Sequence, residues 1–136
     1  RYSPMEMLTV STSVREELVN ITGAVQKMVS EKGWSDGALL LFCPHTTGAV
    51  TINESADPSV VRDIVVNMAK LVPHRGDYRH MEGNSDAHIK SSLFGPDQLV
   101  IVEQGQLQLG TWQGIFFCEF DGPRNRKLWV KFMASG

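Results

Sequence analysis

The chain has 136 residues, a formal net charge of −2 and no block of like charge, which argues against a nucleic-acid-binding protein whose affinity comes from neutralising phosphates. A hydrophobic content of 42% with 21% charged residues is typical of one soluble domain, here residues 1–136. No apolar run approaches the roughly 20 residues that span a bilayer, so no membrane partner is expected.

Residues 5–11 alternate in side-chain polarity and predict an opening strand. Thr12 or Ser13 is predicted to cap a helix, and residues 13–16 read Ser-Val-Arg-Glu. This string fits the capping box, in which the Ser and Glu side chains each bind an otherwise unpaired backbone N–H. Apolar residues recur at helical spacing over residues 14–29, and Gly33 is placed to end the helix.

Two strands and a second helix follow. Residues 37–42 form a continuous apolar run short enough for a buried strand, and residues 49–52 predict another. The second helix is expected to have Asp57 as N-cap and Pro58 at its first position, and to end at Pro73. Its predicted buried face comprises Val60, Val61, Ile64, Val65, Met68 and Leu71.

The segment at residues 74–86 has no apolar period, so neither helix nor strand is predicted there. Residues 87–93 are compatible with either. Strands are predicted at residues 99–103, 115–120 and 127–133, with a hairpin-like connection at residues 121–125. This order favours an α+β fold, a single-domain sandwich of a mostly antiparallel sheet with helices packed on it.

Cys43 and Cys118 both lie in apolar, strand-like runs. Buried free thiols in a reducing compartment are favoured over a disulfide. No signal-peptide pattern is visible. We therefore expect a cytoplasmic protein.

Three histidines mark a candidate metal site. His80 and His88 lie in or beside the polar segment, and His45 lies between two predicted strands. Imidazole is the commonest metal ligand, and three protein ligands with an open fourth position are typical of a catalytic metal site. The spacing matches no compact metal-binding motif, so each histidine alone is better explained as a surface residue. The group as a whole, with Glu82 and Asn84 beside it, favours a functional site.

The fourth histidine, His74, is predicted to be an ordinary surface residue. Glu54 and Glu82 are candidate general bases, because a carboxylate beside a metal-bound water or a substrate hydroxyl accepts its proton. Asp57 is better explained as a helix cap, and Glu119, inside an apolar strand, faces either the site or solvent.

Phosphate-binding groups are also present. Thr46, Thr47 and Gly48 offer hydroxyl and backbone N–H groups, and Arg124 and Arg126 offer guanidinium forks that bind phosphate in a bidentate manner. Two arginines in a turn are, however, more often simply solvated.

Residues 110–114 read Gly-Thr-Trp-Gln-Gly. Thr111, Trp112 and Gln113 line a pocket wall under one interpretation. Under the other, the glycines permit a bulge whose tryptophan packs in the core or in a subunit interface.

Taken together, these strings resemble the YjbQ family, the secondary thiamine-phosphate synthase enzyme family. The segments that carry the resemblance are residues 44–47 (Pro-His-Thr-Thr), 51–54 (Thr-Ile-Asn-Glu), 56–58 (Ala-Asp-Pro), 82–84 (Glu-Gly-Asn), 87–90 (Ala-His-Ile-Lys), 105–113 and 122–126. They cover nearly the whole chain in the right order, and Leu-Gly-Thr-Trp-Gln at 109–113 is the most specific. The stretch after His80 is shorter than the family pattern.

The resemblance implies a homotrimer with a metal or anion site built from His45, His80 and His88. It also implies a weak thiamine-phosphate synthase activity, which joins a pyrimidine, as its pyrophosphate, to a thiazole phosphate and releases pyrophosphate. We expect a divalent metal ion, zinc or magnesium, and catalytic roles for Glu82, Glu54 and His45. The expected substrate- and phosphate-binding residues are Thr46, Thr47, Asn84, Thr111, Trp112, Gln113 and Arg124.

Two alternatives remain open at this point. One is a non-catalytic protein that binds a metal and a small phosphorylated metabolite in the same pocket. The other is a structural trimer whose polar segment becomes ordered only at the subunit interface.

Overall fold

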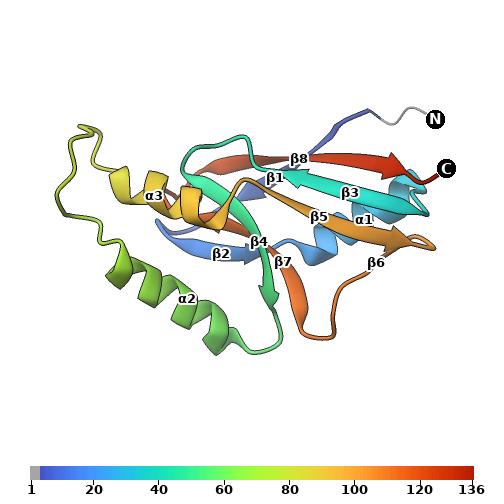
Figure 1. The fold of residues 1–136 in the computed structure, drawn as a ribbon, viewed down its shortest axis with the longest axis horizontal. Coiled ribbons are helices and arrows are strands. Elements are labelled where there is room, and N and C mark those ends of the chain that lie inside the picture. The colour runs from blue at the N-terminus through green and yellow to red at the C-terminus, as the bar shows by residue number, and fades with distance from the viewer. Residues whose placement is uncertain (1–3) are drawn as a thin grey trace.

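The computed structural model describes residues 4–136. Its strands form two sheets, and every strand pair is antiparallel (Figure 1). The five-stranded sheet has the order β1 (Glu6–Ser11), β8 (Asn125–Ala134), β3 (Gly37–Phe42), β5 (Asp97–Glu103) and β6 (Gln106–Leu107). The three-stranded sheet has the order β2 (Glu17–Asn20), β7 (Gln113–Glu119) and β4 (Gly48–Glu54). The helices are α1 (Thr22–Lys32), α2 (Pro58–Leu71) and α3 (Ser85–Phe94). The α+β prediction is confirmed.

The main hydrophobic core joins side chains of both sheets and α1. Val25 and Val29 of α1 are fully buried in it, as are Leu39 of β3 and Phe117 of β7. A smaller core beneath α2 and α3 contains Leu18, Ala49, Ala87, Phe116, Cys118 and Phe120. Both cysteines are buried free thiols, as predicted, and burial raises the pKa of each.

The predicted start of the first helix is wrong. The chain forms strand β2 before α1 begins at Thr22, because Leu18 and Val19 pair with β7 in strand register. Glu17, rather than Glu16, accepts hydrogen bonds from the backbone N–H groups of Ser13 and Val14. The predicted end is confirmed, since Gly33 has a left-handed φ of 65°, which glycine adopts without steric cost.

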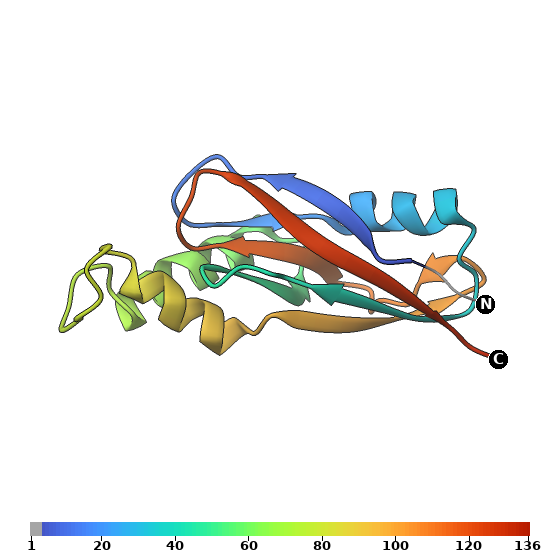
Figure 2. The same ribbon diagram turned by 90° about the horizontal axis from the view of Figure 1, so that it is seen from above.

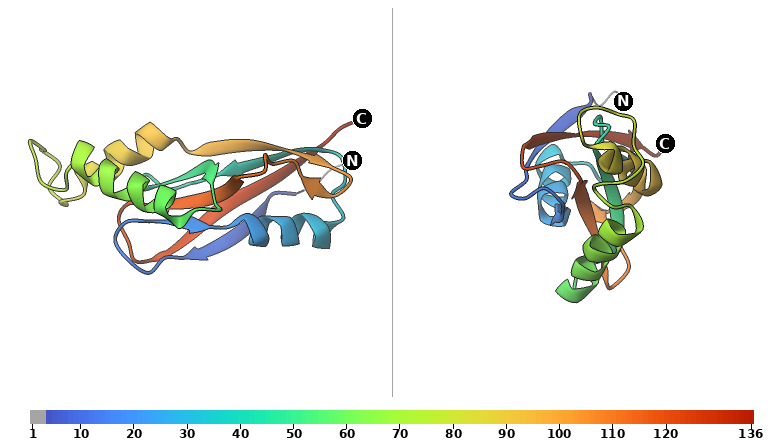
Figure 3. Two further views of the ribbon diagram at one scale, coloured as in Figure 1. Left: turned by 90° about the horizontal axis from the view of Figure 1, so that it is seen from below. Right: turned by 90° about the vertical axis from the view of Figure 1, so that its left-hand side faces the viewer.

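Helix α2 begins as predicted. Asp57 is its N-cap and accepts a hydrogen bond from the backbone N–H of Ser59. The predicted buried face is wrong for the isolated chain, because no residue of α2 is buried. Val61, Ile64 and Val65 pack only partly against the smaller core. The left view of Figure 3 shows α2 lying alongside the three-stranded sheet, on the outside of the molecule.

Residues 87–93, left open between helix and strand, belong to helix α3. The predicted hairpin at residues 121–125 is also corrected, since β7 and β8 lie in different sheets and do not pair. Both strands bury one face in the shared core, so the connection carries the chain across the core from one sheet to the other (Figure 2).

The polar segment predicted at residues 74–86 has no helix or strand up to Asn84, but Ser85 and Asp86 belong to α3, which corrects that end of the prediction. Residues 74–84 project at the end of the molecule opposite the two termini (Figures 1 and 2). None of the helices in residues 4–136 is long and apolar enough to cross a membrane.

Candidate functional site

A buried ion pair joins the two sheets at the end of the molecule where the polar segment lies. The Glu119 carboxylate of β7 and the Arg126 guanidinium of β8 are almost completely buried. Arg126 Nε donates to Glu119 Oε1 at 2.8 Å, and Arg126 also donates to Thr47 Oγ1 at 2.9 Å. Burial alone would raise the pKa of Glu119, but hydrogen bonds from Arg126, Asp121 and Thr12 lower it overall. The Glu119 carboxylate is therefore ionised and fully engaged.

Asp121 links this ion pair to the start of α3. Its backbone N–H donates to Glu119 at 3.0 Å, and its carboxylate accepts from Asn84 Nδ2 at 2.8 Å and from Arg124 at 3.0 Å. Asn84 Oδ1 is buried and has no hydrogen-bond partner among residues 4–136. A buried acceptor without a donor is costly, so this oxygen is a candidate acceptor for an N–H or O–H group of a bound molecule. Arg124 is half exposed beside it and free to bind an anion with its remaining N–H groups.

Helix α3 is held by a second charged network. The Lys90 ammonium is fully buried and donates to Asp86 at 3.0 Å and to Glu16 at 2.7 Å. The Arg15 guanidinium donates two hydrogen bonds to the Asp86 carboxylate, from Nη1 to Oδ2 at 3.1 Å and from Nη2 to Oδ1 at 3.0 Å. Burial opposes ionisation of Asp86, yet Arg15 and Lys90 lower its pKa overall. The network fixes the first turn of α3 and therefore the direction of His88.

His45 belongs to the connection between β3 and β4 and lies beside the start of β8. Its Nε2 accepts a hydrogen bond from the backbone N–H of Lys127 at 2.9 Å. Burial and the nearby positive charge of Arg126 lower the pKa of His45. A neutral imidazole is the form that binds metals. Thr47 lies close by through its bonds to Arg126, whereas Thr46 is exposed.

His80 and His88 lie side by side, with ring centroids 5.3 Å apart and planes at 86°. His80 Nε2 and Glu82 Oε1 are 3.0 Å apart. The two imidazoles border an open groove at the N-terminus of α3. The groove is lined by Asp77, Tyr78, Arg79, His80, Ser85, His88 and Ile89. His74 instead meets the backbone carbonyl of Gly83 at 2.9 Å.

The histidines fit a metal ion only in part within one chain. No three His, Cys, Asp or Glu side chains among residues 4–136 lie close enough together to hold one ion. His80 and His88 supply two adjacent imidazoles, while His45 is engaged at β8. A complete site of the predicted composition therefore needs a ligand from elsewhere, such as a second copy of the chain.

The other predicted site residues lie at the far end of the β4–β7 pair. Glu54 is opposite Gln113 in the ladder, and the Ser55 N–H donates to the Trp112 carbonyl at 2.8 Å. At about 3.3 Å per residue, the length of β4 separates them from Thr47 by roughly 20 Å. Trp112 is 62% exposed, so within one chain it does not pack in the core. Thr111 lies in the same exposed turn.

The ion-pair network of Lys90, Asp86 and Arg15 was not predicted from the sequence. Asp86 and Lys90 are four residues apart, a spacing that places two side chains on one helix face. The spacing indicates a contact only in a helix, and the sequence of residues 87–93 is compatible with either a helix or a strand. Glu119 and Arg126 were each identified as candidate residues. Their ion pair joins strands of different sheets, so no local sequence pattern predicts it.

Known proteins resemble this chain over almost its whole length. A family model described as UPF0047 protein YjbQ-like matches residues 6–135. A UPF0047 protein of Methanocaldococcus jannaschii is 52% identical over 126 residues, 93% of this chain and 91% of that protein. The Bacillus subtilis UPF0047 protein YugU is 50% identical over 132 residues, 96% of this chain and 99% of that protein.

Solved structures agree. A crystal structure of an uncharacterised YjbQ/UPF0047 protein from Clostridium acetobutylicum superimposes with a TM-score of 0.91 at 55% identity, covering 94% of this chain and 99% of that one. A hypothetical protein from Aeropyrum pernix K1 gives a TM-score of 0.92 at 35% identity, covering 98% of this chain and all of that one.

Proposed function

Because this chain belongs to the UPF0047 (YjbQ-like) family, we propose that it is a cytoplasmic, metal-assisted transferase with a weak thiamine-phosphate synthase activity. It acts as a homotrimer whose site is shared between neighbouring copies. Its substrates are small phosphorylated metabolites, and its physiological substrate need not be the thiamine precursors. The observation that carries the proposal is the meeting of two imidazoles, a helix N-terminus and the Asn84–Asp121–Arg124 chain at one end of the molecule.

These groups suit a reaction in which pyrophosphate leaves. Unpaired backbone N–H groups at a helix N-terminus attract anions, and α3 presents its first turn beside His88 and Ser85. Arg124 is the phosphate clamp, because it keeps N–H donors free while Asp121 holds its position. Thr46 offers a hydroxyl donor to the phosphate groups. Asn84 can donate only the second N–H of its Nδ2, because the first donates to Asp121.

A bound divalent ion, zinc or magnesium, would neutralise charge that develops on the leaving pyrophosphate. His80 and His88 of one copy are two of its proposed ligands. His45 is the proposed third, and to bind the ion it would give up the hydrogen bond that its Nε2 accepts from the backbone N–H of Lys127. Glu82 lies within hydrogen-bond distance of His80 and orients that ring. Glu82 or Glu54 serves as general base for the incoming substrate.

Trp112 supports the shared site. Its exposed indole stacks on a heteroaromatic ring, and Thr111 and Gln113 flank that wall. Because Trp112 and Glu54 lie at the far end of β4, they reach the histidines only from another copy. The apolar surfaces described below provide a way to bring two copies together.

The test is the His88→Ala variant. Elemental analysis after metal loading and an assay of thiamine phosphate formation should both show a loss, with metal content near zero and turnover reduced by at least 100-fold, about 3 kcal/mol. Circular dichroism confirms the fold. The matched control is His74→Gln, which removes an imidazole from the same segment and should keep both properties.

A folded His88→Ala variant with full activity and full metal content would refute the proposal. Saturable binding of both phosphorylated substrates by the wild-type protein, without turnover on any divalent metal, would instead identify a binding protein.

A further inference from the structure

The outward face of the five-stranded sheet carries many exposed or partly exposed apolar side chains. These apolar side chains, here called the sheet patch, are Met7, Leu40, Phe42, Leu99, Ile101, Trp129 and Met133. The same face also carries Thr9, Asp97, Glu103, Lys127 and Lys131. Met7 is 60% exposed, Leu99 63% and Ile101 60%. The solvent-facing side of an antiparallel sheet is normally polar, and monomers rarely expose apolar patches of more than a few hundred Å². A partner that covers this face is therefore expected.

The sheet patch is continuous across four strands. Trp129 lies opposite Met7 on one side and opposite Phe42 on the other, and its indole stacks on the Phe42 ring at 5.8 Å. Leu40 lies opposite Leu99. An apolar pit of 130 Å³ opens at its centre. The pit is lined by Met5, Leu40, Phe42, Trp129 and Lys131.

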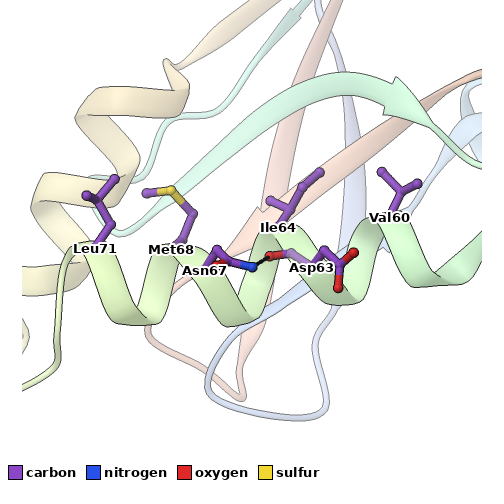
Figure 4. A pocket seen from close by; sticks show the side chains of 6 residues that line it. All are labelled: Val60, Asp63, Ile64, Asn67, Met68 and Leu71. Carbon is purple, nitrogen blue, oxygen red and sulfur yellow. Dashed lines mark hydrogen bonds between the residues drawn. The ribbon is translucent and has the colours of Figure 1, made fainter.

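A second apolar surface runs along α2. Val60, Ile64, Met68 and Leu71 point to the same side of the helix, and Asp63 and Asn67 complete the surface (Figure 4). We call these four apolar side chains the α2 ridge. Leu71 is 72% exposed, and no α2 residue is buried. A 14-residue amphipathic helix is stabilised mainly by packing of its apolar side. Within one chain only Ile64 of the ridge packs against the smaller core, and only in part.

We propose that the α2 ridge of one copy packs on the sheet patch of the next copy. This inference rests on the proposed homotrimer and identifies the two surfaces that form it. A row of helix side chains fits a flat sheet face as in ordinary α/β layers. Because the two surfaces differ, the contact is heterologous. A heterologous contact closes into a trimer when successive copies are related by a third of a turn.

Charge favours this pairing over two sheet patches packed on each other. The pit at the centre of the sheet patch contains Lys131, so face-to-face packing would bring two copies of this cation together. The polar residues beside the α2 ridge are Asp63 and Asn67. A carboxylate facing Lys131 is attractive, and like charges across an interface are disfavoured.

The same contact completes the shared site. Lys127, the residue whose N–H binds His45, lies on the outward side of β8 two residues before Trp129. Helix α2 begins four residues after Glu54, beside Trp112. When the Val60 end of the ridge docks near Trp129, the contact brings the Glu54–Trp112 end of one copy towards the His45 end of its neighbour.

The test uses two variants and their mixture. Leu71→Glu alters only the ridge and Leu99→Glu alters only the patch; both positions are exposed, so each monomer should remain folded. By multi-angle light scattering the wild type should have three times the 15.1 kDa mass of the chain, and each variant should have the mass of one chain. Mixed in equal amounts, the variants should form a 1:1 heterodimer, because one intact ridge meets one intact patch.

Val14→Glu is the matched control, since Val14 is 51% exposed and lies outside both surfaces; it should remain trimeric. The inference is overturned if either variant keeps the wild-type mass, if the mixture forms no heterodimer, or if the wild type is a monomer. A trimeric wild type that responds as expected but lacks thiamine-phosphate synthase activity upholds the docking contact and refutes the proposed activity. A wild type with thiamine-phosphate synthase activity whose Leu71→Glu and Leu99→Glu variants remain trimeric refutes the docking contact and upholds the proposed activity.

Discussion

Glu119 shows how one residue ties the fold to the site. It lies in an apolar strand, and its carboxylate is held by Arg126, Thr12 and the Asp121 backbone. Replacing both partners of a buried ion pair can be neutral, but removing one leaves an uncompensated charge. The pair thus fixes the approach of β8 to β7 and sets the position of Thr47.

Glu119→Gln should lower the free energy of unfolding by about 3–5 kcal/mol at pH 7, because Arg126 then lacks its counter-ion. The folded-state pKa of Glu119 lies below its unfolded value, so its contribution is complete above the unfolded pKa of about 4.3 and is lost as the pH falls through the folded pKa. The difference between wild type and variant should therefore be constant from pH 7 to pH 5 and shrink at lower pH. Urea denaturation across this range measures it.

Glu103→Gln serves as the control, because Glu103 is an exposed carboxylate of β5; its stability change should be close to zero. A Glu119→Gln difference that stays the same down to pH 3 would contradict this account of the ion pair.

At the residue scale, the sequence predicted helix ends correctly where a single residue determines the local backbone. Asp57 and Gly33 were identified as helix cap and helix stop because both act locally. The Asp57 side chain accepts from the nearby backbone N–H of Ser59, and Gly33 adopts a left-handed backbone conformation. The partners of Arg126 and Asn84 come from distant segments, so no spacing in the sequence reveals them.

Among the elements, α3 depends most on charge. Its apolar side chains do not gather on one face, and its buried residues are Asp86, Ala87, Lys90 and Ser91. Lys90 and Arg15 share Asp86, so the helix is docked by ion pairs where α1 is docked by valines. This explains why residues 87–93 have no readable period.

Lys90→Met should cost about 3 kcal/mol, at the lower end of the range for a broken buried pair because Arg15 still holds Asp86. In a double-mutant cycle with Asp86→Asn, the two costs should not add, and the coupling should be about 1–3 kcal/mol. Denaturation of the three variants gives this number, and hydrogen exchange should show faster opening of α3. Strict additivity would mean that Lys90 and Asp86 do not act as a pair.

The first helix illustrates a different failure. Residues 13–16 satisfy the capping pattern, yet β2 forms there because pairing with β7 closes the smaller sheet. Tertiary pairing outweighed a local preference worth about 1 kcal/mol. The α2 prediction failed in the opposite direction, because its apolar period is real but the chain covers its apolar side only in part.

For the molecule as a whole, the two groups of predicted site residues lie at opposite ends of the β4–β7 pair. The sequence identified most members of both groups, and it identified the fold class. It did not show their separation, because that depends on the path of the strands. If both groups belong to one site, that site lies between copies.

The measurement that tests this claim most directly is activity complementation between His88→Ala and Trp112→Ala. Each variant alone should be inactive in thiamine phosphate formation. After the two are unfolded together and refolded as an equal mixture, random assembly should restore about one quarter of the wild-type sites, because one interface in four joins an intact His88 to an intact Trp112. Activity that stays at the sum of the two separate variants, in confirmed mixed trimers, would show that the site is not shared between copies.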